Sequence, residues 1–217
     1  MRHRITVWAT AVTLLTAFCQ PGTSAASEAV APLAQPTDAR PALDLALRVV
    51  QSGDHGNFPF AIVDKHAAQI SVYRHDGTLV GTSTVLLGIT PGDASMPGVG
   101  YRTQTGQLRL EDRTTPAGRF DTIPGRNLSG EAVVWIDYGM ALAIHRLRPA
   151  PTHEKRVQRM ASSNAHDKRI SAGCVVVPET FYDLVIRPVL GNGRAVVYVM
   201  PERTPWQHMW SLLALQE

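Results

Sequence analysis

Short apolar runs separated by turn residues fill the chain from Phe58 onward, and they constrain its fold more than any other feature. Runs of about five residues, rich in β-branched side chains and bounded by turn residues, are typical of strands. The runs are FAIVD (60–64), QISVYR (69–74), TLVGTSTVLLG (78–88), AVVWID (132–137), ALAIH (141–145) and AVVYVM (195–200). The sequence therefore predicts one mainly β domain over 58–201, with a few short helices.

Helical periodicity predicts short helices at both ends of this domain. Residues 42–51 form one helix that ends at Gly53, and the tail 202–217 forms another after the last strand. Each carries apolar residues at helical spacing, namely Leu43, Leu47 and Val50 in the first and Trp206, Met209, Trp210 and Leu213 in the second. We expect the tail helix to pack on its own domain.

Two helices are also expected inside the domain. One spans 152–163 with Thr152 as its cap. The other starts at Pro178, which suits a first helical turn, and is stopped by Pro188 with Gly191. Their apolar faces consist of Val157, Met160 and Ala161 in one and of Phe181, Leu184 and Val185 in the other. The polar, glycine-containing stretch 89–115 is expected to be a long loop, either a lid or an insertion without fixed structure.

The first 25 residues have the three parts of an export signal, which are a basic start, an apolar middle and a small-residue exit. Cleavage after Ala25 or Ala26 would remove Cys19. The apolar run is shorter than the roughly 20 residues that a spanning helix needs, so we expect no membrane anchor. We expect residues 1–25 to be a signal peptide, residues 26–57 to be a linker and short helix, and the protein to be exported to the periplasm.

Charge and composition argue against several classes of partner. Loss of Arg2 and Arg4 with the signal lowers the basic count from 21 to 19, against 18 acidic residues. This balance lacks the basic excess of a nucleic-acid-binding protein. The sequence also contains neither a cluster of metal ligands nor a phosphate-binding loop. We therefore expect a monomer with no nucleic acid, no metal and no organic cofactor.

Cys174 is the only cysteine that remains after the predicted cleavage. Exported proteins meet oxidising conditions, in which cysteines are normally paired or absent, so a solitary one needs an explanation. It is either a small buried hydrophobe or a reactive thiol. A reactive thiol needs a base, and His145 at the end of a predicted strand has small neighbours that leave its face open. Residues 171–173, with Ser171 and Gly173, predict a tight turn whose backbone amides could reach an oxyanion.

Three elements in this order resemble the L,D-transpeptidase catalytic domain, also called the YkuD-type domain. They are TTPAGRF (114–120), AIHR (143–146) and SAGC (171–174). The opening strands are similar as well, so the resemblance covers 58–201. It implies an L,D-transpeptidase-like β-sandwich of mixed sheets. It also implies a cysteine that attacks a peptide bond in peptidoglycan stem peptides, next to a D-stereocentre, and an acyl-enzyme that an amine or water resolves.

The resemblance also implies roles for individual residues. Cys174 would be the nucleophile and His145 the base that takes its proton. The carbonyl group of Arg146 would orient the imidazole. Amides of Gly173 and Cys174 would line the oxyanion site, within the turn that begins at Ser171.

The sequence departs from the family pattern at three places. Ala172 stands where the family has a second histidine, and Val176 stands where it has asparagine or arginine. The stretch between the histidine and the serine is also longer than usual. Arg169 or His166, both close to the cysteine in sequence, could offer a replacement donor to a substrate carboxylate.

These departures leave three functions open. The first is the transpeptidase itself, with an unidentified acceptor. The second is a hydrolase that shares the first half-reaction but resolves the acyl-enzyme with water. The third is a cell-wall-binding module of the same fold without turnover. A module without turnover gains nothing from an unpaired thiol in an oxidising compartment, so the cysteine favours an enzyme.

Overall fold

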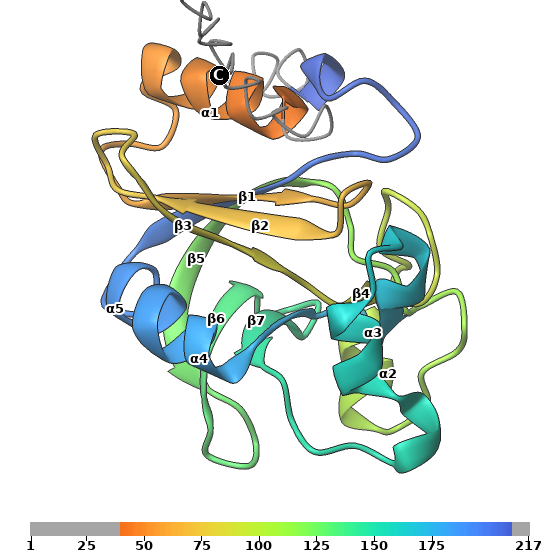
Figure 1. Ribbon diagram of the computed structural model, residues 1–217. Coiled ribbons are helices and arrows are strands. Elements are labelled where there is room, and N and C mark those ends of the chain that lie inside the picture. The colour runs from red at the N-terminus through yellow and green to blue at the C-terminus, as the bar shows by residue number, and fades with distance from the viewer. Residues whose placement is uncertain (1–39, 210–217) are drawn as a thin grey trace, which may run out of the picture. The chain divides into compact units, whose positions relative to one another are not determined.

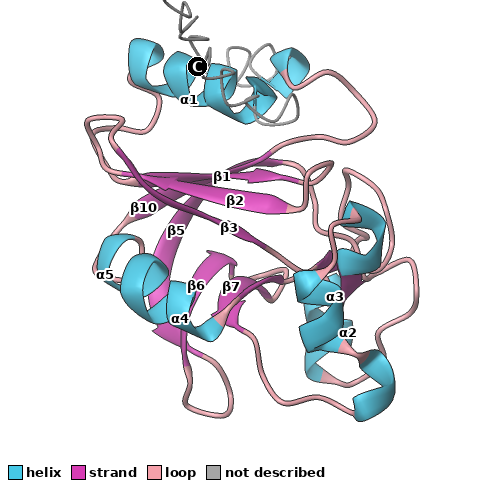
Figure 2. Ribbon diagram, in the orientation of Figure 1, coloured by secondary structure: helices cyan, strands magenta, loops and turns pink. Residues whose placement is uncertain are grey.

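The computed structural model describes residues 40–209, which form a mixed sheet of eight strands with short helices around it (Figure 2). The strand order is β3-β2-β1-β10-β5-β6-β7-β9, and β4 and β8 form a separate parallel pair. The strands are β1 (Phe60–Asp64), β2 (Gln69–Tyr73), β3 (Leu79–Thr84), β4 (Leu87–Gly88), β5 (Gly118–Arg126), β6 (Ala132–Asp137), β7 (Leu142–Arg146), β8 (Arg169–Ser171), β9 (Val175–Val177) and β10 (Ala195–Val199). The predicted mainly β fold with short helices and mixed sheets is confirmed.

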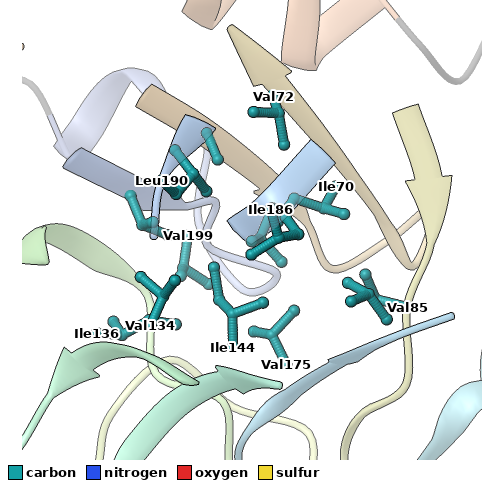
Figure 3. Packing of buried hydrophobic residues seen from close by; sticks show 14 of the residues in the cluster. Ile70, Val72, Val85, Val134, Ile136, Ile144, Val175, Ile186, Leu190 and Val199 are labelled. Atoms are coloured by element: carbon teal, nitrogen blue, oxygen red, sulfur yellow. The ribbon is translucent and has the colours of Figure 1, made fainter. Parts of the chain in front are cut away.

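Strand β5 belongs to both halves of this sheet, and it makes them into two facing layers. Its residues 118–122 pair with β10, whereas its residues 123–126 pair with β6 (Figure 1). One core cluster joins side chains from both layers, among them Ile70, Val134, Ile144 and Val199 (Figure 3). Alternation along each strand therefore sends one set of side chains into this core and the other set to the outer faces.

Most of the predicted strands are present, but two regions differ. The run 78–88 is interrupted at residues 85 and 86, so its end forms the short β4 and pairs with β8. Ala141 lies before β7 in a left-handed turn, with a φ of 54°, rather than inside the strand. Strand β5 was not predicted at all, because Pro124 and Gly125 resemble turn residues. Pro124 is tolerated because β5 changes its pairing partner from β10 to β6 next to this residue.

Helix α1 (Arg40–Ser52) ends before Gly53, as the sequence predicts, but its buried face was predicted wrongly. Leu43 and Leu47, expected to face the core, are each 53% exposed. The buried side chains are Leu45, Ala46 and Val49, which pack on the outer side chains of β1 and β10. The helix carries apolar residues on both faces, so periodicity alone could not choose between them.

The segment after Pro178 forms one irregular coil rather than a regular helix. It consists of α4 (Glu179–Phe181), a π-helical turn η4 (Tyr182–Ile186) and α5 (Arg187–Val189). The wider turn brings Tyr182 and Ile186 into the core, while Leu184 is 76% exposed. Two predictions were therefore wrong: Leu184 does not face the core, and Pro188 lies inside the coil instead of ending it.

The predicted helix 152–163 is also broken. Thr152 begins the short helix η2 (Thr152–Glu154), makes no capping bond, and is separated from α3 (Arg156–Ala161) by Lys155 in a left-handed conformation. Met160 is buried as predicted, but Val157 is 68% exposed. The short helix η3 (Ala165–Lys168) follows and leads into β8.

The stretch 89–115 is not a structureless loop, because it contains helix α2 (Val99–Gln104). Arg102 on this helix pairs with Asp112, and Asp112 also accepts the backbone amide of Arg109. A side chain at Gly100 would collide with the carbonyl oxygen of Gly139, so α2 lies directly against the turn between β6 and β7. These contacts hold the segment in a packed position.

The C-terminal segment packs on the same outer face as α1 (Figure 1). Trp206 and Met209 contact the cluster that Leu45 and Tyr198 belong to, as the sequence predicts for this tail. The remaining predicted helix residues, Trp210 and Leu213, lie outside the described residues, as do the signal peptide and the start of the linker. In the described part of the chain, no helix is both long and apolar enough to cross a membrane.

Candidate functional site

His145 lies near the end of β7, on the face of the sheet that points away from the core. Ile144 occupies the core, so strand alternation turns His145 to the outer face. Its Nδ1 lies 2.8 Å from the carbonyl oxygen of Arg146. A carbonyl oxygen only accepts hydrogen bonds, so Nδ1 carries the proton of the neutral ring. Nε2 is then the atom that can accept a proton.

Cys174 lies beside His145 on the same face, because β9 runs parallel to β7. The register pairs Ile144 with Val175 and His145 with Val176, which puts Cys174 next to Ala143. The thiol donates to the carbonyl oxygen of Ala141 at 3.6 Å. Both Cys174 and His145 line one cavity of about 460 Å³. The strand pairing therefore brings together a sulfur and an imidazole that are 29 residues apart in sequence.

The turn before Cys174 is fixed from within by Ser171. The hydroxyl of Ser171 donates to the carbonyl oxygen of Cys174 at 2.7 Å and accepts the backbone N–H of Gly173 at 3.1 Å. The expected oxyanion role of the Gly173 amide therefore needs correction, since that donor already has a partner. Gly173 has a φ of 124°, which a residue with a side chain rarely adopts.

The turn is also held from outside by Thr115, in the TTPAGRF stretch. Its hydroxyl donates to the carbonyl oxygen of Gly173 at 2.7 Å and accepts the N–H of Gly88 at 2.9 Å. The carbonyl oxygen of Thr115 in turn accepts a bond from Lys65 at 3.0 Å. The resemblance named this stretch but no role for it. The structure makes Thr115 the link between the cysteine turn and the interior.

Lys65 is buried and fully partnered beneath this link. Its amine donates to the carbonyl oxygen of Gly92 at 2.6 Å and to Asp93 at 2.7 Å, besides Thr115. Burial lowers the pKa of Lys65, and the bond to Asp93 opposes that shift. This cluster fastens the start of the 89–115 segment to the β1 end and to the C-terminal segment, where Asp93 accepts the N–H of Glu202.

Burial makes both reactive groups neutral at rest. It lowers the pKa of His145 to about 4, against the ordinary 6.5, and the bond to the Arg146 carbonyl only partly opposes this. Burial also raises the pKa of the Cys174 thiol, which the backbone of Ala143 and the charge of Arg148 oppose. At neutral pH the pair is therefore a thiol and an imidazole, not a thiolate and an imidazolium.

The rest of the cavity wall comes from four places: the end of α2, the β5–β6 hairpin, the β6–β7 turn and the segment after β7. The lining side chains other than the reactive pair and the small Ala141 and Ala143 are Thr103, Gln104, Arg126, Asn127, Leu128, Ser129, Val133, Trp135, Tyr138 and Arg148. The rings of Trp135 and Tyr138 meet edge to face, with centroids 5.1 Å apart. The wall thus offers aromatic surface, amide groups and two cations to a substrate.

Sequence reasoning missed Arg126 and Arg148, the two cations of this cavity. Arg148 pairs with Glu131 at 2.5 Å, and Arg126 donates to the carbonyl oxygen of Gly130 at 2.5 Å. Arg148 could have been suspected, because it follows His145 in the motif HRLR. Arg126 could not, because its strand was not predicted. Arg146 itself points elsewhere, to Asp183 at 3.0 Å and over the Tyr182 ring.

The two residues proposed as replacement substrate donors do not lie at this cavity. Arg169 forms an ion pair with Glu202 and its side chain is 11% exposed, so it belongs to the Lys65 cluster. His166 is exposed on η3, and neither residue lines the cavity. Proximity in sequence was misleading here, because β8 runs away from the cavity to pair with β4.

The two motif departures have different surroundings. Val176 is fully buried and packs with Leu86 and Met160, so an apolar side chain is what this site accommodates. Ala172 is exposed beside the turn, where no described contact requires its identity. Within residues 40–209, no group of three or more His, Cys, Asp or Glu side chains could hold a metal ion.

Solved structures similar to this chain include L,D-transpeptidases and a helical cell shape determining protein, at low sequence identity. An L,D-transpeptidase in complex with imipenem is 13% identical over 65% of this chain and 58% of its own, with a TM-score of 0.38. The catalytic domain of an E. faecium L,D-transpeptidase is 19% identical over 66% of this chain and 98% of its own, with a TM-score of 0.36. The helical cell shape determining protein Pgp2 from Campylobacter jejuni is 14% identical over 75% of this chain and 56% of its own, with a TM-score of 0.44.

The chain spans about half of the length of several of these structures, such as 49% of an avibactam carbamoyl enzyme and 50% of a cysteine-to-serine transpeptidase mutant. No family model matches the sequence. No match to a curated protein was found either.

Proposed function

We propose that this protein is an exported cysteine acyltransferase of the L,D-transpeptidase type that acts on peptidoglycan stem peptides. The observation that carries the proposal is the shared outer face of β7 and β9. There a thiol and an imidazole line one cavity, and the imidazole's Nδ1 is bound to the Arg146 carbonyl. The SAGC, AIHR and TTPAGRF elements give the reaction class, because they resemble that family.

The first half-reaction starts from the neutral pair. As the Cys174 sulfur bonds to a peptide carbonyl carbon, its proton passes to Nε2 of His145. The carbonyl oxygen gains negative charge, and the Cys174 amide is the candidate donor to it, since the Gly173 amide is already bound to Ser171. The C–N bond then breaks, the leaving amine takes the proton from Nε2, and a thioester remains.

The second half-reaction reverses these roles with an acceptor. An amine attacks the thioester, His145 takes a proton from it, and the thiol leaves with a proton. Water in place of the amine would make the protein a hydrolase. The aromatic and cationic wall supports a substrate with apolar and carboxylate groups, because Arg126 and Arg148 can pair with carboxylates.

The neutral state of the imidazole permits this order of events, although its low pKa makes it a weak base in the free protein. A base that is neutral at physiological pH can accept a proton, whereas one already protonated cannot. The reaction then does not need a standing thiolate in the free protein. Substrate binding would expel water from the cavity and bring the thiol from the Ala141 carbonyl toward Nε2.

A carbapenem tests the proposal directly. Imipenem should add its mass once to the mature protein, at Cys174, because its strained carbonyl replaces the peptide carbonyl. Cys174→Ala should stay unlabelled with its circular dichroism unchanged. Intact-mass and peptide mapping give the answer, and folded wild-type protein that takes no adduct would contradict the proposal.

Purified sacculi then separate transfer from hydrolysis. Transfer to another stem peptide should produce new cross-linked muropeptides, and hydrolysis should shorten stems without cross-links. Cys174→Ala is the matched control in both cases.

A cell-wall-binding module without turnover is the second candidate. The thiol's raised pKa and its bond to Ala141 rather than to His145 favour it. That function predicts sedimentation with sacculi, an unchanged muropeptide profile and slow alkylation of Cys174 by iodoacetamide.

A further inference from the structure

A second cavity, of about 790 Å³, lies apart from the Cys174 site. It forms where the β1–β2 turn, the connection between α3 and η3, and the segment after β10 meet. Its size is within the range of small-molecule binding sites. It shares no lining residue with the cavity of Cys174 and His145.

Lys168 gives this cavity a buried cation. Only 7% of the residue is exposed, yet it lines the cavity. No hydrogen bond or ion pair joins its amine to any residue in the range 40–209, and burial lowers its pKa with no charged neighbour to oppose the shift. The Lys168 amine is not among the polar atoms that are shut off from solvent, so it reaches the cavity and is free to pair with a ligand there.

The other buried lysine, Lys65, has partners that Lys168 lacks. Lys65 is more deeply buried, with 2% of the residue exposed, and it donates to three acceptors. The acidic group on the second cavity's wall, Asp64, points to its own turn, where it accepts the amides of His66 and Ala67. One oxygen of Asp64 is therefore occupied by its own turn, and Lys168 lines the cavity without an ion pair in the described part of the chain.

Another part of the cavity wall is apolar and partly aromatic. Trp206 and Pro205 lie on it, and Trp206 is fixed from behind by the cluster under α1. Ser163 and Asn164 add a hydroxyl and an amide at the rim. An indole that is held rigidly beside hydrogen-bonding groups suits a ligand with one apolar face and a polar edge.

We propose that this cavity binds a sugar that carries a carboxylate. Lys168 would pair with the carboxylate, and Trp206 would lie against the apolar face of the pyranose ring. A charge-assisted bond between a buried amine and a carboxylate is stronger than a neutral one, so the carboxylate supplies most of the selectivity. The site does not depend on the chemistry of Cys174 and would exist in a protein without turnover.

Two sugars that differ in the carboxylate test this. Isothermal titration on the mature Cys174→Ala protein should show binding of N-acetylmuramic acid, which carries a lactyl carboxylate, and much weaker binding of N-acetylglucosamine. Lys168→Met should weaken the first sugar by roughly tenfold or more and leave the second unchanged. Trp206→Ala should weaken both. Because Cys174 is absent, a failure of the acyltransferase proposal does not affect this measurement.

Matched controls keep the result interpretable. Lys155→Met removes an exposed lysine and should leave both affinities as they are. Lys168→Arg keeps the charge and should retain most of the binding, which answers the case in which the methionine variant does not fold. Equal affinity of the wild-type cavity for the two sugars, or no binding of either, would overturn the proposal.

Discussion

Lys65 and His145 are both buried titratable side chains, but their surroundings differ in one respect. The amine of Lys65 donates to three acceptors, so its charge is matched inside the protein. The imidazole of His145 has one ring nitrogen bound to a backbone carbonyl, while the ring lines a cavity with the thiol of Cys174. A buried group whose partners all come from the fold stabilises the fold. A buried group that still has a hydrogen-bonding atom without a partner can act on a substrate.

A chain of hydrogen bonds connects the Lys65 cluster to the turn that carries Cys174. Lys65 bonds to the Thr115 carbonyl, and the Thr115 hydroxyl bonds to the Gly173 carbonyl next to the cysteine. The Lys65 cluster thus holds the turn from which the Cys174 thiol projects. Substitutions can disrupt each region separately, and we expect one kind to slow the reaction and the other to lower stability.

Removing the imidazole should have the largest effect of all on the reaction. His145→Ala should slow acylation of Cys174 by imipenem by roughly two to four orders of magnitude, because the general base is lost. Stopped reactions analysed by intact mass give the rate. His166→Ala, which removes an exposed histidine, is the control, and an unchanged rate in His145→Ala would assign the base elsewhere.

Removing the buried amine should act mainly on stability. Lys65→Met leaves Asp93 without its cation and should lower the free energy of unfolding by about 3–5 kcal/mol. Urea unfolding followed by circular dichroism measures it, with Lys155→Met as the exposed control. A change below 1 kcal/mol, on the order of a surface pair, would show that this cluster is not what fastens the segment.

Lowering the pH should reduce the stability of the protein, because the buried imidazole of His145 resists protonation. The folded pKa of His145, about 4, lies below its ordinary 6.5, so the unfolded chain binds the proton more readily. The contribution to stability is complete above pH 6.5 and is lost as the pH falls toward 4, by about 3 kcal/mol. Unfolding curves of wild type and His145→Gln across this range should converge as the pH falls. Parallel curves would contradict the shift.

A substitution at Thr115 should have the smallest effect and should affect both stability and acylation. Thr115→Val removes a donor to Gly173 and an acceptor for Gly88, and buried groups left without partners cost about 1–3 kcal/mol. We expect a modest loss of stability together with slower acylation by imipenem. Thr115→Ser keeps the hydroxyl and should restore both. A valine variant that loses stability but acylates at the wild-type rate would separate the turn from the chemistry.

Much of the fold was readable from the chain because strands leave a short-range signature. β1, β2, β6 and β10 appear within a residue of their predicted positions, and every residue of β1 and β10 is buried, so their apolar runs fill both faces. The candidate pair was readable too, because a cysteine with no partner left after the predicted cleavage and a histidine at a strand end can both be read from the sequence. The identities of Cys174 and His145, and the mainly β class, came from sequence.

The tertiary structure alone decided which face of each element is buried and what lies around the site. Leu43 and Leu184 are exposed because packing partners, not periodicity, choose the face of a short helix. Arg169 lies in the Lys65 cluster, whereas Arg126 and Arg148 line the cavity. Sequence proximity did not predict this, because strand pairing joins residues that are far apart in sequence. Burial, which sets the pKa of His145, likewise belongs to the assembled sheet, since no stretch of sequence removes water from a side chain by itself.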